Sequence, residues 1–160
     1  MDHREQLVDT RVKDVLRTKG TLQTDADVLS ASPTTIVYDC IDRMASNDFG
    51  SILVMDDGDI AGIFTERDYM RNLALEGRRS QETEVGEVMT QDVVTVTPDT
   101  HLEECLDLMT DIECRHLPVV DADGRLTDII SMRDCTRQIS EAAKSEALQL
   151  RNFITGTYPV

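Results

Sequence analysis

The chain has 160 residues, of which 31 are Asp or Glu and 16 are Lys or Arg, and its formal net charge is −15. This length fits one ordinary domain or two small ones that share a core, and the acidity argues against nucleic acid or an anionic membrane as a partner, because both attract basic surfaces. The sequence has neither the roughly 18 consecutive apolar residues of a transmembrane helix nor a signal peptide, which predicts a cytoplasmic protein.

The first half of the chain predicts a helix, a β-hairpin and a second helix. In chain order these elements are a helix over 35–47, strands over 51–55 and 59–64, and a helix from about 66 to 76. The helices follow from apolar residues at helical spacing, and the strands from short apolar segments. An acidic turn that contains Gly58 separates the two strands, which is typical of a hairpin.

The second half predicts the same order after a short leading strand. Its elements are a strand over 93–96, a helix over 102–112, strands over 117–120 and 126–130, and a helix that follows residue 131. The sequence Thr100-His101-Leu102-Glu103 fits a capping box at the start of the first of these helices. The acidic turn 121–124, which ends in glycine, again predicts a hairpin.

An internal repeat relates the two halves. Residues 32–44 align with 97–109 at an offset of 65, and the match continues at an offset of 66 beyond the hairpin turns. The leading segments 12–16 and 85–89 also agree. One unit of about 60 residues buries only a marginal core, so we expect the two copies to pack together. We divide the chain into a first repeat over 12–80, a second over 85–140, and a C-terminal helix and tail over 141–160.

Neither the cysteines nor the histidines predict a metal site. The four cysteines, at positions 40, 105, 114 and 135, form no C-x-x-C pair, and the histidines, at positions 3, 101 and 116, share no helix face. The acidic turns lack the glycine and glutamate positions that complete a calcium loop. Cys40 and Cys105 fall on apolar faces of predicted helices, which indicates buried side chains.

Each repeat places a hydroxyl residue where a buried strand ends and an Asp three residues later. These pairs are Thr65 with Asp68, and Ser131 with Asp134. One interpretation is structural, since this spacing makes a capping box at a helix start. The other is functional, since a helix N-terminus favours anions and an Asp there can accept hydrogen bonds from a diol such as ribose. The sequence leaves both interpretations open.

Arginines gather around both motifs in an otherwise acidic chain. Eight of the arginines belong to the two groups, which are Arg67, Arg71, Arg78 and Arg79 in the first repeat and Arg115, Arg125, Arg133 and Arg137 in the second. Arginine binds phosphate with two parallel hydrogen bonds, so these groups indicate an anionic ligand. The alternative for any one of them is a solvated helix residue that pairs with a nearby acid.

The repeat resembles the cystathionine-β-synthase (CBS) domain, and the chain resembles a stand-alone tandem pair of such domains, known as a Bateman module. The motifs that carry the resemblance are Gly62-Ile63-Phe64-Thr65-Glu66-Arg67-Asp68-Tyr69, Val88-Met89-Thr90, Val94-Thr95-Val96-Thr97-Pro98 and Arg115-His116-Leu117-Pro118-Val119. The resemblance as a whole covers residues 12 to about 140. The resemblance implies an α+β fold in which two β-α-β-β-α repeats pack pseudo-symmetrically.

The same resemblance implies ligands and their sites. The expected ligand is an adenosine compound (AMP, ADP, ATP, NAD(H) or S-adenosylmethionine) bound in clefts between the repeats, and the expected assembly is a homodimer. By motif position, Asp68 and Asp134 bind ribose hydroxyls, and Thr65 and Ser131 contact ribose or phosphate. Residues expected around the adenine are Ser32, Thr97, Ile63 and Ile129. Residues expected at the phosphates are Arg67, Arg115, His116 and Arg133.

The second repeat departs from the family pattern at two positions. Thr127-Asp128 stands in a region where the family often has glycine, and Arg133 stands where glycine often precedes the second Asp. Because Asp128 adds negative charge near an expected phosphate, we expect the Asp68 site to be the better nucleotide site.

These observations predict a non-catalytic regulatory module that senses an adenosine nucleotide and controls another, unknown polypeptide. The sequence shows no activated nucleophile with its base, no paired catalytic carboxylates and no metal cluster, so we do not predict an enzyme. The alternative is a ligand-independent structural adaptor that binds a partner through its dimer surface or through the apolar C-terminal segment 147–154.

Overall fold

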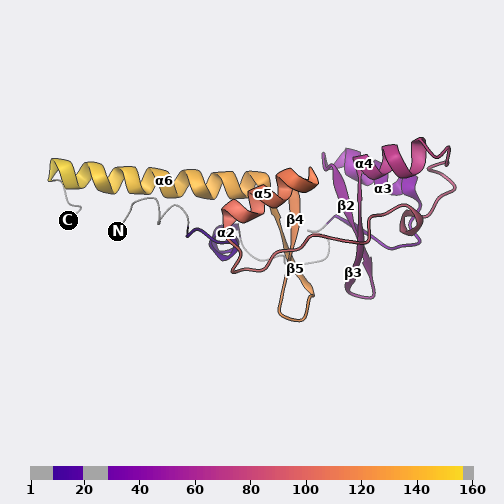
Figure 1. The fold of residues 1–160 in the computed structure, drawn as a ribbon, viewed down its shortest axis with the longest axis horizontal. Coiled ribbons are helices and arrows are strands. Elements are labelled where there is room, and N and C mark those ends of the chain that lie inside the picture. The colour runs from indigo at the N-terminus through magenta and orange to yellow at the C-terminus, as the bar shows by residue number, and fades with distance from the viewer. Residues whose placement is uncertain (1–8, 20–28, 157–160) are drawn as a thin grey trace.

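A computed structural model describes residues 9–19 and 29–156 of the chain. It has the predicted α+β fold, with two small sheets side by side and helices packed against them (Figure 1). The strands of the first sheet, in the spatial order β1-β2-β3, are β1 (Ser30–Ala31), β2 (Ser51–Asp56) and β3 (Asp59–Thr65). The strands of the second sheet are β4 (His116–Val120) and β5 (Leu126–Ser131).

The first repeat buries its core between its sheet and its helices. The helices are α3 (Val37–Ser46) and α4 (Glu66–Asp68), and α4 continues directly as a π-helical segment, η2 (Tyr69–Ala74). Apolar side chains at helical spacing on α3, Cys40 among them, lie in one buried cluster with the inward side chains of the strands. The predicted helix from 66 to 76 is therefore present, but most of it is π-helical rather than α-helical.

The second repeat has the same plan with a longer final helix. Its helices are α5 (Leu102–Ile112) and α6 (Met132–Thr155). Cys105 on α5 and Cys135 on α6 are both fully buried in its core cluster. The distal half of α6 projects away from both sheets (Figure 1), and its large apolar side chains are exposed, namely Leu148, Leu150, Phe153 and Ile154.

The leading segment of each repeat packs on the core of the other repeat. Helix α2 (Val12–Lys19) buries Val12 and Val15 in the second core, and the short 3-10 helix η3 (Val85–Glu87) buries Val85 in the first. The backbone bonds are reciprocal: Val12 N–H donates to the Thr100 carbonyl at 2.9 Å, and Val85 N–H donates to the Thr35 carbonyl at 2.8 Å. This exchange joins the two repeats into one body.

Two sequence predictions of local structure are wrong, and the hairpins are right. The expected strand 93–96 is only a single parallel bridge between Val96 and Val119, and the rest of the segment pairs with no strand among the described residues. The expected capping box is absent, since α5 has His101 at its N-cap, and the Thr100 hydroxyl accepts from Thr97 N–H instead. Both acidic turns close hairpins, with Gly58 and Gly124 at positive φ, as their position requires.

Candidate ligand site at the junction of the repeats

Both hydroxyl-and-Asp motifs form complete capping boxes at helix starts. The Thr65 hydroxyl accepts from Asp68 N–H at 3.1 Å, and the Asp68 carboxylate accepts from Thr65 N–H at 2.9 Å. Ser131 and Asp134 make the same two bonds at 3.1 and 3.0 Å. The structural interpretation of these pairs is therefore confirmed, and any binding role must coexist with it.

The Asp68 carboxylate has more partners than its capping bond. Its Oδ2 also accepts from the Thr65 hydroxyl, and its Oδ1 accepts from the Thr90 hydroxyl at 2.9 Å and from Asn72 Nδ2 at 3.3 Å. Asp68 is only 7% exposed. A carboxylate offers about four acceptor positions, so these donors, together with Thr65 N–H, use the full capacity of Asp68.

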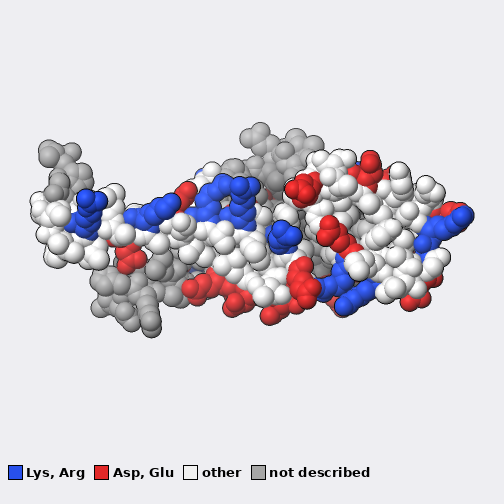
Figure 2. Space-filling view, turned by 90° about the horizontal axis from the view of Figure 1, so that it is seen from above, with Lys and Arg blue, Asp and Glu red and all other residues white. Residues whose placement is uncertain are grey.

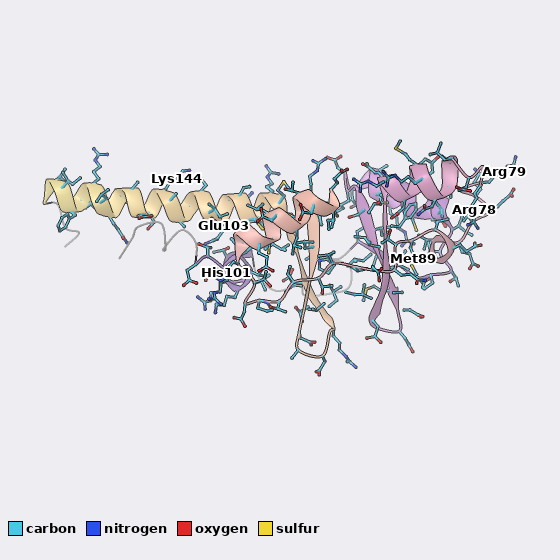
Figure 3. All side chains as sticks on the ribbon, viewed as in Figure 1. Arg78, Arg79, Met89, His101, Glu103 and Lys144 are labelled. Atoms are coloured by element: carbon cyan, nitrogen blue, oxygen red, sulfur yellow. The ribbon has the colours of Figure 1, made fainter. Side chains whose placement is uncertain are left out.

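The linker between the repeats supplies part of this network. Thr90 and Ile63 exchange two backbone hydrogen bonds, at 2.8 and 2.9 Å, which lays the linker along β3. The close approach requires Gly62, because a Cβ there would lie 2.5 Å from Met89 Sδ and 2.7 Å from the Thr90 carbonyl oxygen. Figure 3 shows Met89 beside this strand. Ile63, expected at the adenine, is half-buried under this contact.

Asp128 of the second repeat occupies the position that corresponds to Gly62 of the first. Its side chain is 1% exposed and lies on β5 opposite the buried Val119. Oδ1 accepts from Ile129 N–H at 2.8 Å, but Oδ2 is buried without a hydrogen-bond partner among the described residues. Asp134 of this repeat is half-buried, unlike Asp68, and Ile129 is half-buried like Ile63.

The starts of the hairpin strands meet where the two repeats touch. The ring of Phe49 packs edge-on against His116 with centroids 5.0 Å apart, and Cys114 Sγ lies 3.9 Å from Ser51 Oγ. Under the alignment of the repeats, Phe49 corresponds to Cys114 and Ser51 to His116, so the two contacts are related by a pseudo-twofold axis.

Both hydroxyl-and-Asp motifs begin at strand ends that lie next to this contact between the repeats. Thr65 pairs with Ser51 in the first hairpin, and Ser131 pairs with His116 in the second. Both helix starts are also tied to the preceding strand, since Glu66 N–H donates to the Gly50 carbonyl at 3.1 Å and Met132 N–H to the Arg115 carbonyl at 2.8 Å. The fold therefore brings together, from both repeats, the residues expected at the ribose and phosphates.

The arginines divide into those near the junction and those remote from it. Arg67 forms an ion pair with Glu113 across the two repeats, while Arg115 and Arg133 are exposed. Arg78 and Arg79 lie at the far end of the first repeat, where they pair with Glu87 and Glu82 (Figure 3). Arg125 follows the hairpin turn at the opposite end of the second sheet from Ser131.

Ser32 and Thr97 are exposed and occupy equivalent turns. Each backbone N–H donates to the hydroxyl three residues on, Thr35 or Thr100, at 3.1 Å. They are not beside the capping boxes: β1 pairs Ala31 with Val54, so Ser32 follows about 13 Å along the sheet from the level of Thr65. A ligand that touches both places must extend along the sheet.

Three residues that bind side chains of the candidate site were not identified as site residues from the sequence. Thr90 and Asn72 bind the Asp68 carboxylate, and Glu113 binds Arg67. The motif Val88-Met89-Thr90 was a signal for the first of these, but the other two depend on which segments the fold brings together. In the described part of the chain, no group of three or more His, Cys, Asp or Glu side chains is placed to hold a metal ion.

The buried thiols of Cys40 and Cys135 are poorly ionised, whereas the hydrogen bond from Cys135 lowers the pKa of the third buried thiol, Cys105. Burial raises the pKa of Cys40 to about 11. A hydrogen bond from Cys135 to Cys105 and burial together raise the pKa of Cys135. Such thiols behave as small apolar side chains rather than nucleophiles.

Charge is unevenly spread over the surface. Basic side chains run along α6 in Figure 2, whereas acidic ones gather over the two repeats. Arg137, Lys144 and Arg151 recur every seven residues on α6 and are exposed. None of the helices in the described ranges is both long and apolar enough to cross a bilayer.

Comparison with known proteins identifies both repeats. A family model for the CBS domain matches residues 10–75 and 85–141. A mitochondrial CBS domain-containing protein of Arabidopsis thaliana, CBSX3, is 34% identical over 154 residues, which cover 93% of this chain and 74% of the relative.

Solved structures agree with this assignment. A putative signal-transduction protein with CBS domains from Burkholderia ambifaria is 40% identical with a TM-score of 0.70, and the match covers 81% of this chain and 93% of that one. The cytosolic domain of the magnesium channel MgtE, solved in complex with ATP, is 27% identical with a TM-score of 0.56 over 69% of this chain and 44% of that one.

Proposed function

This chain belongs to the CBS domain family as a tandem pair of repeats, and on that premise we propose that it is a non-catalytic regulatory module that binds an adenosine nucleotide where its two repeats meet. CBS pair proteins are regulatory modules. The observation that carries the proposal is the convergence of both hydroxyl-and-Asp motifs on one junction, with cationic side chains from both repeats beside them.

The roles of the side chains follow from their chemistry. Asp134 and Asp68 accept hydrogen bonds from ribose hydroxyls, and Ser131 and Thr65 contact ribose or phosphate. Phosphate oxygens accept hydrogen bonds from guanidinium and imidazole groups. The residues that supply these groups are Arg67, Arg115, Arg133 and His116. The adenine packs on Ile63 or Ile129 and reaches toward Ser32 or Thr97.

The carboxylates of the two proposed sites, Asp68 and Asp134, differ in how accessible they are to a ribose. Asp68 is buried, and donors of its own repeat and of the linker saturate its carboxylate, so a ribose must displace one of them. Asp134 is more exposed. We therefore rank the Asp134 site first for ribose, which reverses the order expected from the sequence.

Regulation follows from linkage. A ligand that touches both repeats shifts the molecule toward whichever arrangement binds it more tightly, and the size of that shift is set by the difference in affinity. We propose that the arrangement is transmitted to another polypeptide by a homodimer in the cytoplasm. ATP in the related MgtE domain supports the class of ligand.

Binding calorimetry tests the proposal. AMP, ADP, ATP, NADH and S-adenosylmethionine are titrated into the wild type and into Asp134→Asn, Asp68→Asn and Asp123→Asn, the last being a matched change at an exposed hairpin acid remote from the junction. We expect saturable binding of at least one compound, lost in Asp134→Asn and kept in Asp123→Asn. A folded wild type that binds none of them contradicts the proposal.

The exposed apolar end of α6 favours a second function, that of a ligand-independent adaptor. Leu148, Leu150, Phe153 and Ile154 are each more than half exposed, and unpartnered apolar surface of this kind marks interaction sites. If the adaptor function is correct, Phe153→Ser with Ile154→Ser abolishes partner binding or self-association in sedimentation velocity, while Asp134→Asn leaves it intact.

A further inference from the structure

The ion pair between Arg67 and Glu113 places a carboxylate where the proposed function needs a phosphate. Arg67 lies at the start of α4, one residue before Asp68, and Glu113 belongs to the other repeat. The guanidinium group binds carboxylates and phosphates through the same geometry. An anionic ligand that uses Arg67 must therefore compete with Glu113.

Glu113 is held at this position by the fold of its own segment. It is the C-cap of α5 and has a left-handed backbone conformation, with φ of 53°. The next residues are fixed against the first repeat, since Cys114 lies against Ser51 and His116 packs on Phe49. The side chain of Glu113 is thus presented to Arg67 by a segment with several contacts across the junction.

The pseudo-symmetric pair of residues on the other side of the junction offers an internal comparison. Asp48 is the counterpart of Glu113, because it also follows a helix end and also has a left-handed backbone, with φ of 57°. Arg133 is the counterpart of Arg67. Both of these side chains are exposed, and within the described residues no ion pair joins them. The competing carboxylate is therefore a property of the Arg67 side of the junction alone.

We propose that Glu113 is a specificity-determining residue that occupies Arg67 in the absence of ligand and weakens the binding of phosphate-bearing ligands relative to the bare nucleoside. The inference rests on the proposed nucleotide function and deepens it. Ligand phosphate displaces the Glu113 carboxylate from the Arg67 guanidinium, so binding also releases one link between the repeats.

The test compares ligands that differ only in phosphate. Adenosine, AMP and ATP are titrated by calorimetry into the wild type, Glu113→Gln and Asp48→Asn. Each variant removes one carboxylate at a left-handed helix end, so they alter the net charge equally. Glu113 has 72% of its side chain exposed, and ion pairs of this kind are weak, so we expect AMP and ATP to bind Glu113→Gln about two- to fivefold more tightly.

The affinity for adenosine should be the same in Glu113→Gln, in Asp48→Asn and in the wild type, because adenosine has no phosphate to compete with a carboxylate. Asp48→Asn should change AMP affinity less than Glu113→Gln does. In a double-mutant cycle, adding Arg67→Gln should remove the gain caused by Glu113→Gln. Thermal unfolding of each variant confirms that it is folded.

The failures of the two proposals can be told apart. If the wild type binds adenosine or AMP but Glu113→Gln leaves AMP unchanged, or strengthens adenosine to the same degree, the role of Glu113 is wrong and the nucleotide function stands. An equal gain from Asp48→Asn also contradicts it, because the effect would then be one of overall charge. If no folded form binds any of the three compounds, the role of Glu113 fails, and the nucleotide function fails with it only if ADP, NADH and S-adenosylmethionine do not bind either.

Discussion

The two repeats carry the same motif in different surroundings. In the first, the linker lies along β3 over Gly62, and Thr90 fastens Asp68. In the second, Asp128 occupies the position of that glycine, and one of its buried oxygens has no hydrogen-bond partner in the part of the chain that the structure describes. The comparison teaches that two copies of one motif differ through the residues that pack on them. The linker covers the first copy, whereas the second copy is more exposed and has a buried carboxylate on the neighbouring strand.

The largest expected effect comes from a substitution that breaks the contact between the linker and β3. In Gly62→Ala the new Cβ meets the Thr90 carbonyl and Met89 Sδ far inside van der Waals contact, and the backbone oxygen cannot move without losing the bridge to Ile63. We expect a loss of about 3 kcal/mol in the free energy of unfolding, the upper end for overpacking. Urea unfolding measures it, with Gly50→Ala as the control, since a Cβ at Gly50 meets only the Glu66 side chain at ordinary distance. Equal, small losses in both would show that the linker does not lie on β3.

A smaller loss of folding stability should follow when only the Thr90 hydroxyl, which donates to Asp68, is removed. Thr90→Val keeps the shape of the side chain but deletes the donor to Asp68 Oδ1. Because this hydrogen bond reaches a buried carboxylate, we expect a loss of about 2 kcal/mol. The same variant frees an acceptor position on Asp68, so ribose binding at the first site should improve. Unfolding and nucleotide titration are measured together, and a stable variant with unchanged binding would contradict the role of Thr90.

The second repeat should respond with the opposite sign. Asp128→Asn retains Oδ1 as the acceptor for Ile129 N–H and replaces an unpaired charged oxygen by a neutral amide, which costs less to bury. We expect a gain of about 1 kcal/mol in chemical denaturation at neutral pH. Thr127→Val, at the exposed neighbour, controls for general effects on β5. A clear loss of stability in Asp128→Asn would mean that Oδ2 is hydrogen-bonded in solution.

The last prediction concerns the buried thiol of the first repeat, whose ionisation affects stability only at alkaline pH. Since burial raises the pKa of Cys40 from 9.0 to about 11, the unfolded chain ionises first, and the stability that depends on a neutral thiol is intact below pH 9 and declines as the pH rises through 11. Cys40→Ala should therefore flatten the fall in stability between pH 9 and pH 11 while lowering stability at every pH. A slope that is identical in wild type and variant would contradict a buried, neutral thiol.

Much of each repeat was predictable from the sequence because the signals are local. The glycine turns, the alternation of short apolar segments and the duplicated spacing of Thr65 with Asp68 all specify structure within a few residues. The π-helical segment after Asp68 was not predictable, because apolar spacing does not distinguish one kind of helical turn from another over six residues.

The contacts between repeats were beyond the sequence for a physical reason. The apolar stripe of residues 12–16 fits either core equally well, since the two cores are copies of one another, and only the fold shows that α2 packs on the second. The partners of Asp68 and Arg67 come from segments that lie 22 and 46 positions away, at Thr90 and Glu113. Pattern and spacing carry no information about such pairs.

Amide hydrogen exchange with and without ATP tests the central claim most directly, because it locates binding along the chain. If a nucleotide binds between the repeats, exchange slows at the starts of α4 and α6, at 65–68 and 131–134, and at the facing segments 49–51 and 113–116. Protection confined to one repeat, or to the distal half of α6, or no protection at saturating ATP, AMP and S-adenosylmethionine, would contradict a nucleotide site at the junction.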